Sequence, residues 1–281
     1  MLASPPHRER IYAWAVGSLH MLLGDGLMST DWTIRFAHDI EGMDKNPRSG
    51  RNPFEGYIRG CGLQFGNAPQ LCTQDPDFQT ALRLATGRTV VAPARLMNLF
   101  LLFKFFLPKI GLGHIVEFGS YKGGSAIFMA YLARRFLKGV SVYGFDTFAG
   151  MPPTDRGIDL HRAGDFQDIN LEELRQYVEQ RGLTNLHFVQ GRFEETVPTT
   201  LQTVGPLALV HIDCDIYSAV AYCYDVSKGA LVQGGYIVLD DPVTASCLGA
   251  LEAMEAYMIQ RDGLHAEQVY PHPVFRYPPI P

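Results

Sequence analysis

The most constraining feature of the sequence is an alternation, from about residue 95 onward, between short apolar runs and segments with helical spacing. Apolar runs of roughly four to eight residues predict strands, and the segments between them predict helices. This alternation is typical of an α/β fold, in which a parallel sheet carries helices on both faces. Short apolar strands also fit a sheet buried on both sides. The predicted strands are Ile115–Phe118, Val140–Phe145, Leu186–Val189, Leu207–Ile212, Tyr236–Leu239, Ala266–Tyr270 and Val274–Tyr277.

The expected sheet therefore has seven strands and is mostly parallel. The sequence Pro-His-Pro interrupts the chain between Ala266–Tyr270 and Val274–Tyr277, and we expect these two to form a final antiparallel pair. Ligands bind beyond the carboxyl ends of strands in such sheets, near the point where the strand order reverses. Acidic residues follow several of the predicted strands, so these residues are the first candidates for function.

Helix signals support this interpretation. Asn170 starts a predicted helix, with Glu173 three residues later in the pattern of a capping box, and Gly182 ends it. Three more helices are predicted: Ser125–Phe136; Ser218 to Leu231, closed by Gly234 and Gly235; and one capped by Thr244 with Leu248, Leu251, Met254 and Met258 on one face.

The first 95 residues show no such alternation. We predict an N-terminal segment of helices and loops over 1–95, acting as a lid and as a candidate for dimer contacts, and one α/β domain over 96–281. Asp44–Arg59 is polar and rich in Gly and Pro, which predicts an ordered loop of the kind that covers binding sites. Ile11–Leu23 is interpreted as a buried helix rather than a signal peptide, because no small-residue cleavage site follows it.

Composition excludes several classes of protein. The 281-residue chain has a formal net charge of −5, so no broadly basic surface is expected, and nucleic acid is excluded as the main partner. The longest apolar run, Leu99–Leu107, contains Lys104 and is too short to span a bilayer. The five cysteines form no C-x-x-C pair, which argues against zinc and indicates a reducing compartment, here the cytoplasm.

The first candidate for chemistry is a glycine-rich turn between a predicted strand and a predicted helix. Gly119, Gly123 and Gly124 lie in this turn. Glycine permits positive φ and a close approach of a ligand to the backbone, and the helix N-terminus beyond favours a carboxylate or a phosphate. The spacing is not G-x-G-x-x-G, so a dinucleotide is disfavoured. An ordinary turn without a ligand stays as the alternative.

The second candidate is Asp146, which ends the next predicted strand. A carboxylate at this position can accept hydrogen bonds from both hydroxyls of a ribose. The alternative is that Asp146 only caps a turn. The neighbouring glycine-rich turn favours the binding role.

The third candidate consists of acids at the ends of two further strands. Asp213 and Asp215 follow one strand, and Asp240 and Asp241 follow another. If the strands are neighbours, these carboxylates converge, and a divalent cation relieves their repulsion. Ligands that are all oxygen indicate Mg²⁺, or else Mn²⁺ or Ca²⁺, rather than zinc. The alternative is helix capping, by Asp215 near Ser218 and by Asp241 near Thr244.

These motifs, in this order, resemble the macrocin O-methyltransferase family, over roughly residues 86–260. Thr89–Asn98 also resembles the segment that precedes the first strand in that family. Cys214, between the two acids, and the pair Ser218-Ala219 depart from the family pattern. The motifs are E-x-G-x-x-x-G-G at Glu117–Gly124, D-[ST]-F-x-G-[LM]-P at Asp146–Pro152, G-D-F at Gly164–Phe166, G-x-F-x-x-T-x-P at Gly191–Pro198, D-x-D-[LIM]-Y at Asp213–Tyr217 and G-G-[YF]-[IV]-x-x-D-D at Gly234–Asp241.

The resemblance implies a Rossmann-like class I methyltransferase domain over 96–281, with S-adenosylmethionine as cofactor. Members of the family methylate sugar hydroxyls on macrolides and related natural products. It therefore also implies a small-molecule acceptor, a sugar or polyol part of a natural product, and Mg²⁺ or Mn²⁺ as the metal. A homo-oligomer is a further candidate assembly.

The resemblance also implies roles for individual residues. Asp213, Asp240 and Asp241 are the implied metal ligands, Asp213 is also the implied general base, and Asp215 is a reserve ligand. A bound Mg²⁺ lowers the pKa of an acceptor hydroxyl, which a carboxylate can then deprotonate. The implied cofactor-binding residues are Thr89, Glu117, Gly119, Ser120, Tyr121, Gly123, Ser125, Asp146, Thr147, Gly191, Arg192, Phe193 and Asp213.

Fewer signals point to the acceptor. Tyr217 either lines the acceptor pocket or packs in the core, His161 is a candidate on a loop over the site, and His211 is expected to be a core histidine. Edge exposure is the alternative for Arg192, and core packing is the alternative for Phe193. The segments expected to cover the acceptor are Phe54, Glu55, Tyr57 and the loop Gly150–Phe166.

Three other functions compete with this one. A metal-independent class I methyltransferase would use the acids as caps, and a non-catalytic scaffold would keep only the cofactor. A nucleotide-dependent oxidoreductase is disfavoured because G-x-G-x-x-G is missing. The metal-dependent O-methyltransferase is the function that the acidic residues favour.

Overall fold

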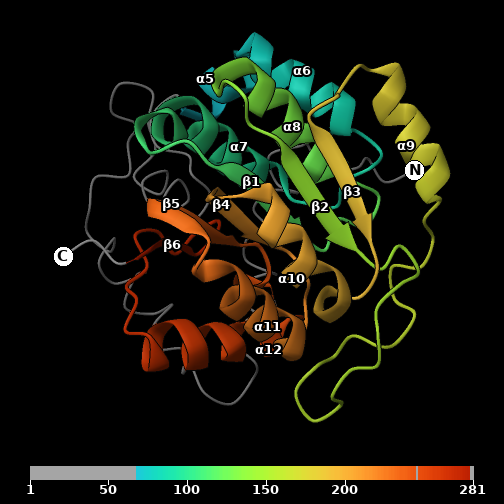
Figure 1. The fold of residues 1–281 in the computed structure, drawn as a ribbon, viewed down its shortest axis with the longest axis vertical. Helices are drawn as coiled ribbons and strands as arrows, with labels where there is room; N and C mark the ends of the chain where they lie inside the picture. Colours follow the sequence, from blue (N-terminus) through green and yellow to red (C-terminus); the bar gives the residue numbers. More distant parts are fainter. Residues whose placement is uncertain (1–67, 245, 279–281) are drawn as a thin grey trace, which may run out of the picture. The chain divides into compact units, whose positions relative to one another are not determined.

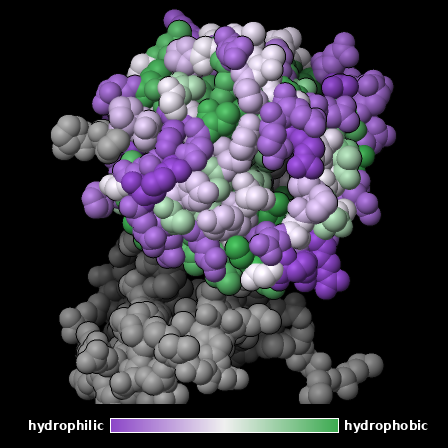
Figure 2. All heavy atoms as spheres, turned by 60° about the horizontal axis from the view of Figure 1, so that its bottom comes forward, coloured by the Kyte–Doolittle hydropathy of each residue, from purple (hydrophilic) through white to green (hydrophobic). Residues whose placement is uncertain are grey.

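The computed structural model describes residues 68–244 and 246–278. The predicted helix over Ile11–Leu23, the predicted loop over Asp44–Arg59 and the acceptor candidates Phe54, Glu55 and Tyr57 lie outside these residues. Within them, no helix is long and apolar enough to cross a membrane. On the face in Figure 2, hydrophilic residues predominate and hydrophobic ones are scattered between them.

The described residues form an α/β fold around one sheet, as predicted (Figure 1). The sheet has six strands in the order β3-β2-β1-β4-β5-β6. The first five strands run parallel, and β6 is antiparallel to β5. The strands are β1 His114–Phe118, β2 Val142–Asp146, β3 Leu186–Gln190, β4 Leu207–Ile212, β5 Leu231–Leu239 and β6 Val274–Tyr277.

The prediction of a seventh strand was wrong. Ala266–Tyr270 makes only an isolated bridge, from Gln268 to Val274, and does not form a strand. β6 pairs with the open edge of β5, where Gly235–Val238 give it four partners. Pro271 and Pro273 have no N–H to donate, so the segment before β6 cannot extend a ladder of its own.

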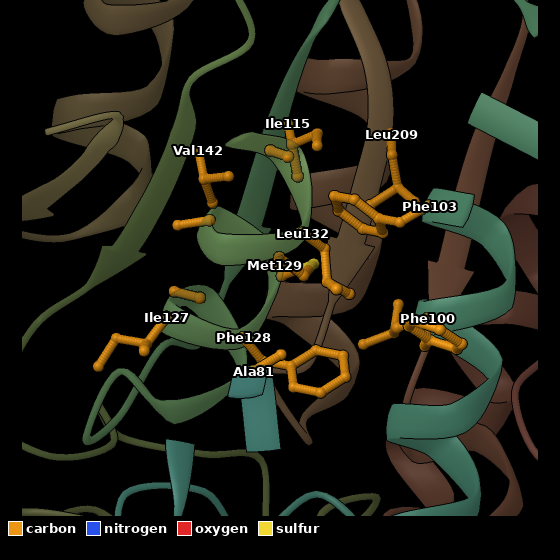
Figure 3. Close-up of a cluster of buried hydrophobic side chains, with 14 of the residues drawn as sticks. Ala81, Phe100, Phe103, Ile115, Ile127, Phe128, Met129, Leu132, Val142 and Leu209 are labelled. Atoms are coloured by element: carbon orange, nitrogen blue, oxygen red, sulfur yellow. The ribbon is translucent and has the colours of Figure 1, made fainter. Parts of the chain in front are cut away.

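Helices cover both faces of the sheet (Figure 1). One cluster of buried side chains joins the sheet to α6–α9, and a second joins it to α10–α12. Figure 3 shows the first cluster, in which Phe128 and Leu132 of α8 lie near Phe100 of α7 and Leu209 of β4. The helices are α5 Ala68–Gln74, α6 Pro76–Ala85, α7 Pro93–Leu101, α8 Gly124–Phe136, α9 Leu171–Gln180, α10 Phe193–Val204, α11 Tyr217–Lys228 and α12 Leu248–Ala253.

Short π-helical and 3₁₀ segments follow two of these helices and one strand. A π-helical turn and then a 3₁₀ turn follow α7, a 3₁₀ turn follows β5, and a π-helical segment follows α12. Their bounds are η1 Leu102–Phe106, η2 Leu107–Lys109, η3 Asp241–Val243 and η4 Met254–Arg261.

Two of the four predicted helices have the expected ends. α8 begins one residue before the predicted Ser125 and ends at Phe136. The side chain of Asn170 caps α9 by accepting a hydrogen bond from the N–H of Glu173 (3.1 Å). Gly182, just beyond α9, has a φ of 62°, as expected of a glycine that ends a helix.

The two later helices were predicted with wrong ends. α11 stops at Lys228, and Leu231 already begins β5, which also includes Gly234 and Gly235. Leu231–Gly235 has no continuous apolar pattern from which a strand could be predicted. In the structure this part of β5 also pairs irregularly with β4. Thr244 does not cap α12, because η3 intervenes and Cys247 stands at the start of that helix.

Residues 68–95 pack against the α/β domain. Phe78 of α6 makes edge-to-face contacts with Phe128 of α8 (ring centroids 5.8 Å apart) and with Phe100 of α7 (5.4 Å). Residues 68–95 belong to the same compact unit as the rest of the described chain. The proposed lid and dimer roles of the N-terminal segment remain predictions.

The strand order reverses between β1 and β4, because the chain leaves β1 for β2 on one side and returns to β4 on the other. The turns that follow β1 and β4 therefore meet at the carboxyl edge of the sheet. Their contact is close: a Cβ on Gly119 would lie 1.7 Å from the carbonyl oxygen of Asp213. Only glycine fits there, and its φ is 90°.

Candidate active site

A pocket of about 390 Å³ opens at this edge of the sheet. This volume falls in the usual range of small-molecule sites, roughly 300–1,000 Å³. The turns after β1, β2, β3, β4 and β5 all contribute to its wall, together with the segment before α7. Twelve of the predicted site residues line it: Thr89, Gly119, Ser120, Tyr121, Ser125, Asp146, Thr147, Arg192, Phe193, Asp213, Asp240 and Asp241.

The glycine-rich turn leads into the N-terminus of α8. Gly123 stands at the N-cap with a φ of 77°, and no side chain caps the helix. A Cβ on Gly124 would lie 2.4 Å from the backbone of Arg88 and Thr89, so the segment before α7 crosses directly over this helix end. Ser125, in the first turn of α8, lines the pocket. This wall offers backbone N–H groups and a helix dipole to an anionic part of a ligand.

Asp146 caps the turn after β2, the alternative considered for it, and its ribose-binding role remains a prediction. One carboxylate oxygen accepts a hydrogen bond from the N–H of Tyr121 (2.8 Å), and the other accepts one from the N–H of Phe148 (2.7 Å). The side chain thus caps the turn after β2 and also ties it to the glycine-rich turn. It lines the pocket as well. Burial raises the pKa of Asp146, and the backbone hydrogen bonds oppose that increase.

Three predicted cofactor residues do not line the pocket: Glu117, Gly123 and Gly191. Glu117 is fully buried behind the glycine-rich turn, where it accepts a hydrogen bond from Ser120 (2.7 Å) and pairs with His211 (3.1 Å). Glu117 therefore holds the glycine-rich turn in place from its buried side, away from the pocket. His211 is the buried core histidine that was expected, with its Nδ1 toward Glu117.

The acids after β4 and β5 come together. Oxygen atoms of Asp213, Asp240 and Asp241 all lie within 4.8 Å of one another. β4 and β5 are neighbours in register, with Ile212 opposite Leu239, which brings the residues that follow to the same edge. The geometric part of the sequence prediction is therefore correct.

Helix capping does not account for these acids. The cap of α11 comes from Asp159, a buried residue of the loop after β2, which accepts a hydrogen bond from the N–H of Tyr217 (2.9 Å). Asp241 accepts from the N–H of Asp215 (2.8 Å), within the turn after β4 rather than at a helix end. Asp159 was missed in the sequence because its polar loop carries no helix signal.

The carboxyl groups of Asp213 and Asp241 lie among other acids, in surroundings that disfavour their ionised form. Burial raises the pKa of Asp213 well above its usual value, and repulsion by Asp240, Asp241 and Asp215 adds to the increase. Burial likewise raises the pKa of Asp241, followed by repulsion from Asp215 and Asp240. No hydrogen bond among the described residues ends on the carboxylate of Asp213. These two side chains therefore need a cation or a proton.

Asp240 differs, because it already has partners. Arg95 of α7 forms an ion pair with one of its oxygens, and Nε2 of His272 lies 2.9 Å from the other. Burial alone would raise the pKa of Asp240, but the hydrogen bond from His272 and the positive charge of Arg95 hold it below its usual value. Burial lowers the pKa of His272 to about 4, so at neutral pH its imidazole is uncharged.

Arg95 and His272 were both missed in the sequence analysis. Arg95 lies within Thr89–Asn98, a segment noted for its resemblance, but no spacing links it to Asp240. Nδ1 of His272 lies 3.2 Å from Nδ2 of Asn98, so α7, β5 and the segment before β6 share one buried polar network. Such a network is visible only once the fold is known.

Of the other candidate residues, most line the pocket and one does not. His161 and Asp215 line the pocket, as do Gly150 and Phe166 of the predicted covering loop. Tyr217 does not line it and packs instead against Tyr257 (ring centroids 6.2 Å apart). Phe193 lines the pocket and also packs against Phe118, while the Arg192 side chain is largely exposed.

A parallel sheet of this order, with a glycine-rich turn after β1, an acid at the end of β2 and a pocket across the point where strand order reverses, defines a class I methyltransferase. The chain belongs to the macrocin-O-methyltransferase (TylF) family, whose model matches residues 79–266. It is accordingly an S-adenosylmethionine-dependent O-methyltransferase.

Curated relatives carry related activities. The chain is 30% identical over 177 residues to the 8-demethyl-8-(2,3-dimethoxy-alpha-L-rhamnosyl)-tetracenomycin-C 4'-O-methyltransferase of Streptomyces olivaceus, covering 59% of this chain and 67% of that protein. It is 26% identical over 195 residues to the mycinamicin III 3''-O-methyltransferase of Micromonospora griseorubida, covering 65% and 74%.

Solved structures show the same fold. The calicheamicin methyltransferase CalS11 matches with a TM-score of 0.59 at 20% identity, over 84% of this chain and 98% of that one. The O-methyltransferase NovP matches with a TM-score of 0.56 at 23% identity, over 67% and 81%.

Proposed function

We propose that the protein transfers the methyl group of S-adenosylmethionine to a hydroxyl of a sugar or polyol part of a natural product, with the help of Mg²⁺ or Mn²⁺. The relatives from Streptomyces olivaceus and Micromonospora griseorubida, by their names, methylate glycosylated natural products. The observation that carries the metal-dependent form of the proposal is the convergence of Asp213, Asp240 and Asp241 in the pocket.

The residues fit a hard divalent cation. Three carboxylates offer only oxygen, the donor that Mg²⁺ and Mn²⁺ prefer. Asp241 is buried and Asp213 is half-buried, and neither forms an ion pair among the described residues. Burial, followed by repulsion from the neighbouring acids, raises the pKa of both carboxyl groups. Asp240 shares its charge with Arg95 and would be the third ligand.

The cofactor would lie across the other half of the pocket. Asp146 stands where it can receive the ribose hydroxyls, and the N-terminus of α8 where it can receive the carboxylate of the methionine part. Ser120, Tyr121, Thr147 and Phe193 complete this wall. Gly119 and Asp213 lie in contact, so the glycine-rich turn that would hold the cofactor adjoins the acids at the end of β4.

The chemistry divides between cofactor, metal and protein. The sulfonium makes the methyl carbon electrophilic, and a bound divalent ion would lower the pKa of the acceptor hydroxyl and hold a diol in place. Asp213 would take the hydroxyl proton on a carboxylate oxygen as the acceptor oxygen bonds to the methyl carbon, whose bond to sulfur breaks to leave S-adenosylhomocysteine. Arg95 and His272 keep Asp240 ionised and fixed while this happens.

One observation favours a second candidate, a metal-independent methyltransferase. Arg95 already neutralises Asp240, so one of the three acids has its countercharge within the protein. In that case Asp213 alone would deprotonate the acceptor, and the other two acids would be structural.

Methyl transfer to a panel of glycosylated natural products that lack one O-methyl group tests the proposal. The enzyme is first treated with EDTA and then supplied with Mg²⁺. We expect a methylated sugar hydroxyl, no turnover in EDTA and recovery with Mg²⁺. Full activity in EDTA would establish the metal-independent candidate, and methylation of aglycone hydroxyls only would overturn the sugar acceptor.

A further inference from the structure

A second cluster of metal-binding side chains lies in the pocket wall beside the three acids. It consists of His161 from the loop after β2, Asp215 from the turn after β4 and Cys247 at the start of α12. Nε2 of His161 lies 3.6 Å from Oδ1 of Asp215 and 3.7 Å from Sγ of Cys247. The third side of this triangle, from Cys247 Sγ to Asp215 Oδ1, is 3.3 Å.

These separations match a tetrahedral zinc site. With Zn–N near 2.0–2.1 Å and Zn–S near 2.3 Å, tetrahedral angles place nitrogen and sulfur about 3.6 Å apart and nitrogen and oxygen about 3.4 Å apart. One ion can thus contact all three atoms with only small movements of the side chains. Imidazole, thiolate and carboxylate together suit Zn²⁺ rather than Mg²⁺.

The histidine is oriented as a metal ligand should be. Nδ1 of His161 lies 3.2 Å from a carboxylate oxygen of Asp165, which leaves Nε2 toward Asp215 and Cys247. The ring also packs against Phe166, with centroids 5.6 Å apart. A carboxylate behind a ligating histidine, fixing the ring and its tautomer, is a usual feature of zinc sites.

The backbone of Asp215 is held in place as well. Its backbone has a φ of 61°, and its N–H donates to Asp241. Asp159 anchors the loop that carries His161 onto the N-terminus of α11. The three ligands therefore come from three separate elements, and other contacts already fix the two that carry His161 and Asp215.

We propose that His161, Asp215 and Cys247 bind one Zn²⁺, at a site separate from the three acids that are proposed to hold Mg²⁺. Three protein ligands leave the fourth position open toward the pocket, for water or for an oxygen of the acceptor. Binding replaces the proton of the Cys247 thiol by the metal ion and releases that proton to solvent. The ion would tie the loop after β2 to the start of α12.

This site has no signature in the sequence. His161 and Cys247 are 86 residues apart and Asp215 and Cys247 are 32 apart, so no ligand spacing of a zinc motif is present. The scattered cysteines argued against zinc for that reason. The proposal depends on the fold alone, and it holds whether or not Mg²⁺ is required for methyl transfer.

Cobalt titration of the reduced 281-residue chain in excess Mg²⁺ tests the proposal, because Co²⁺ occupies zinc sites and reports a thiolate ligand by a near-ultraviolet charge-transfer band. We expect the band to saturate at one Co²⁺ per chain and to disappear when Zn²⁺ is added. Cys247→Ser should abolish the band, and His161→Gln should weaken Co²⁺ binding at least 10-fold.

Three control variants distinguish Co²⁺ at this site from Co²⁺ bound elsewhere on the chain. Cys72→Ala, at a buried cysteine of α5, and His187→Gln, at an exposed histidine of β3, should leave the titration unchanged. Asp213→Asn should also keep the band, because Asp213 belongs to the proposed Mg²⁺ site. A wild-type protein without the band, or a Cys247→Ser variant that retains it, would overturn the proposal.

Discussion

Arg95 and Asp240 form a buried ion pair between α7 and the end of β5, across 145 residues of sequence. Their side chains are 15% and 6% exposed. Arg95 also donates to the hydroxyl of Thr244 (2.7 Å) and to the carbonyl of Pro271 (3.3 Å). The guanidinium group of Arg95 thus ties α7 to Asp240, to Thr244 and to the segment before β6.

Removing this guanidinium should cost considerable stability. Arg95→Met leaves the carboxylate of Asp240 buried with only a neutral histidine, and breaking such a pair costs about 3–5 kcal/mol. We expect urea unfolding to show a loss of this size, and Arg95→Met combined with Asp240→Asn to recover part of it. Arg83→Met, at an exposed arginine of α6, is the control. Equal losses for Arg83→Met and Arg95→Met would contradict a stabilising role for the buried pair.

Asp213→Asn should separate chemistry from binding. The amide keeps the size of the side chain but cannot take a proton, so we expect kcat to fall by roughly 10²–10⁴-fold. The affinity for S-adenosylhomocysteine, measured by calorimetry, should stay within a factor of about three. Loss of both together would show that Asp213 holds the fold of the pocket instead.

Asp146→Ala should weaken cofactor binding. Each lost hydrogen bond to a charged acceptor is worth about 1.5–3 kcal/mol, which corresponds to roughly 10- to 100-fold in the dissociation constant of S-adenosylhomocysteine. Asp155→Ala, at an exposed acid of the same loop, is the matched control. Unchanged affinity in Asp146→Ala would leave the side chain only its role in capping the turn.

Asp262, an acid that does not line the pocket, predicts how stability depends on pH. Asp262 accepts hydrogen bonds from Arg261 (2.8 Å) and from the hydroxyl of Tyr224 (2.6 Å), and it pairs with Lys228. The hydrogen bond from Arg261, more than any other contact, lowers the pKa of Asp262 below its usual value. Because the pKa of Asp262 is lower in the folded state than in the unfolded state, the ionised carboxylate stabilises the fold. This contribution is fully present above the unfolded-state pKa, near 3.9, and is lost as the pH falls from there through the folded-state pKa.

Asp262→Asn should therefore destabilise the protein at pH 7, by about 1–3 kcal/mol, and by much less near pH 2. Urea unfolding at a series of pH values measures the difference. Glu255→Gln, at an exposed acid of η4, should show no such dependence. A deficit for Asp262→Asn that is the same at every pH would mean that packing, not ionisation, is responsible.

Local sequence signals predicted most of the elements around the pocket. β4 was predicted with its observed ends, and α8 and α9 were found within one or two residues, because apolar runs, a cap and a glycine act over a few neighbouring positions. β5 was predicted only over its last four residues, since Leu231–Gly235 lacks both apolar continuity and regular pairing.

The convergence of Asp213 with Asp240 and Asp241 was also predictable, because neighbouring parallel strands end at one edge of a sheet. The partners of these acids were not. Arg95, Asp159 and His272 reach the site from a helix, a loop and the segment before β6, and no periodicity in the sequence relates such positions. Contacts of this kind follow from tertiary packing alone.

The central claim is that Asp213, Asp240 and Asp241 share one divalent ion, and Mn²⁺ binding measured by electron paramagnetic resonance tests it without need of an acceptor. We predict one Mn²⁺ per chain, displaced by Mg²⁺, and binding at least 10-fold weaker in Asp213→Asn and in Asp241→Asn, with Glu255→Gln unchanged. Mn²⁺ binding that is equally weak in wild type and in both variants would contradict the claim.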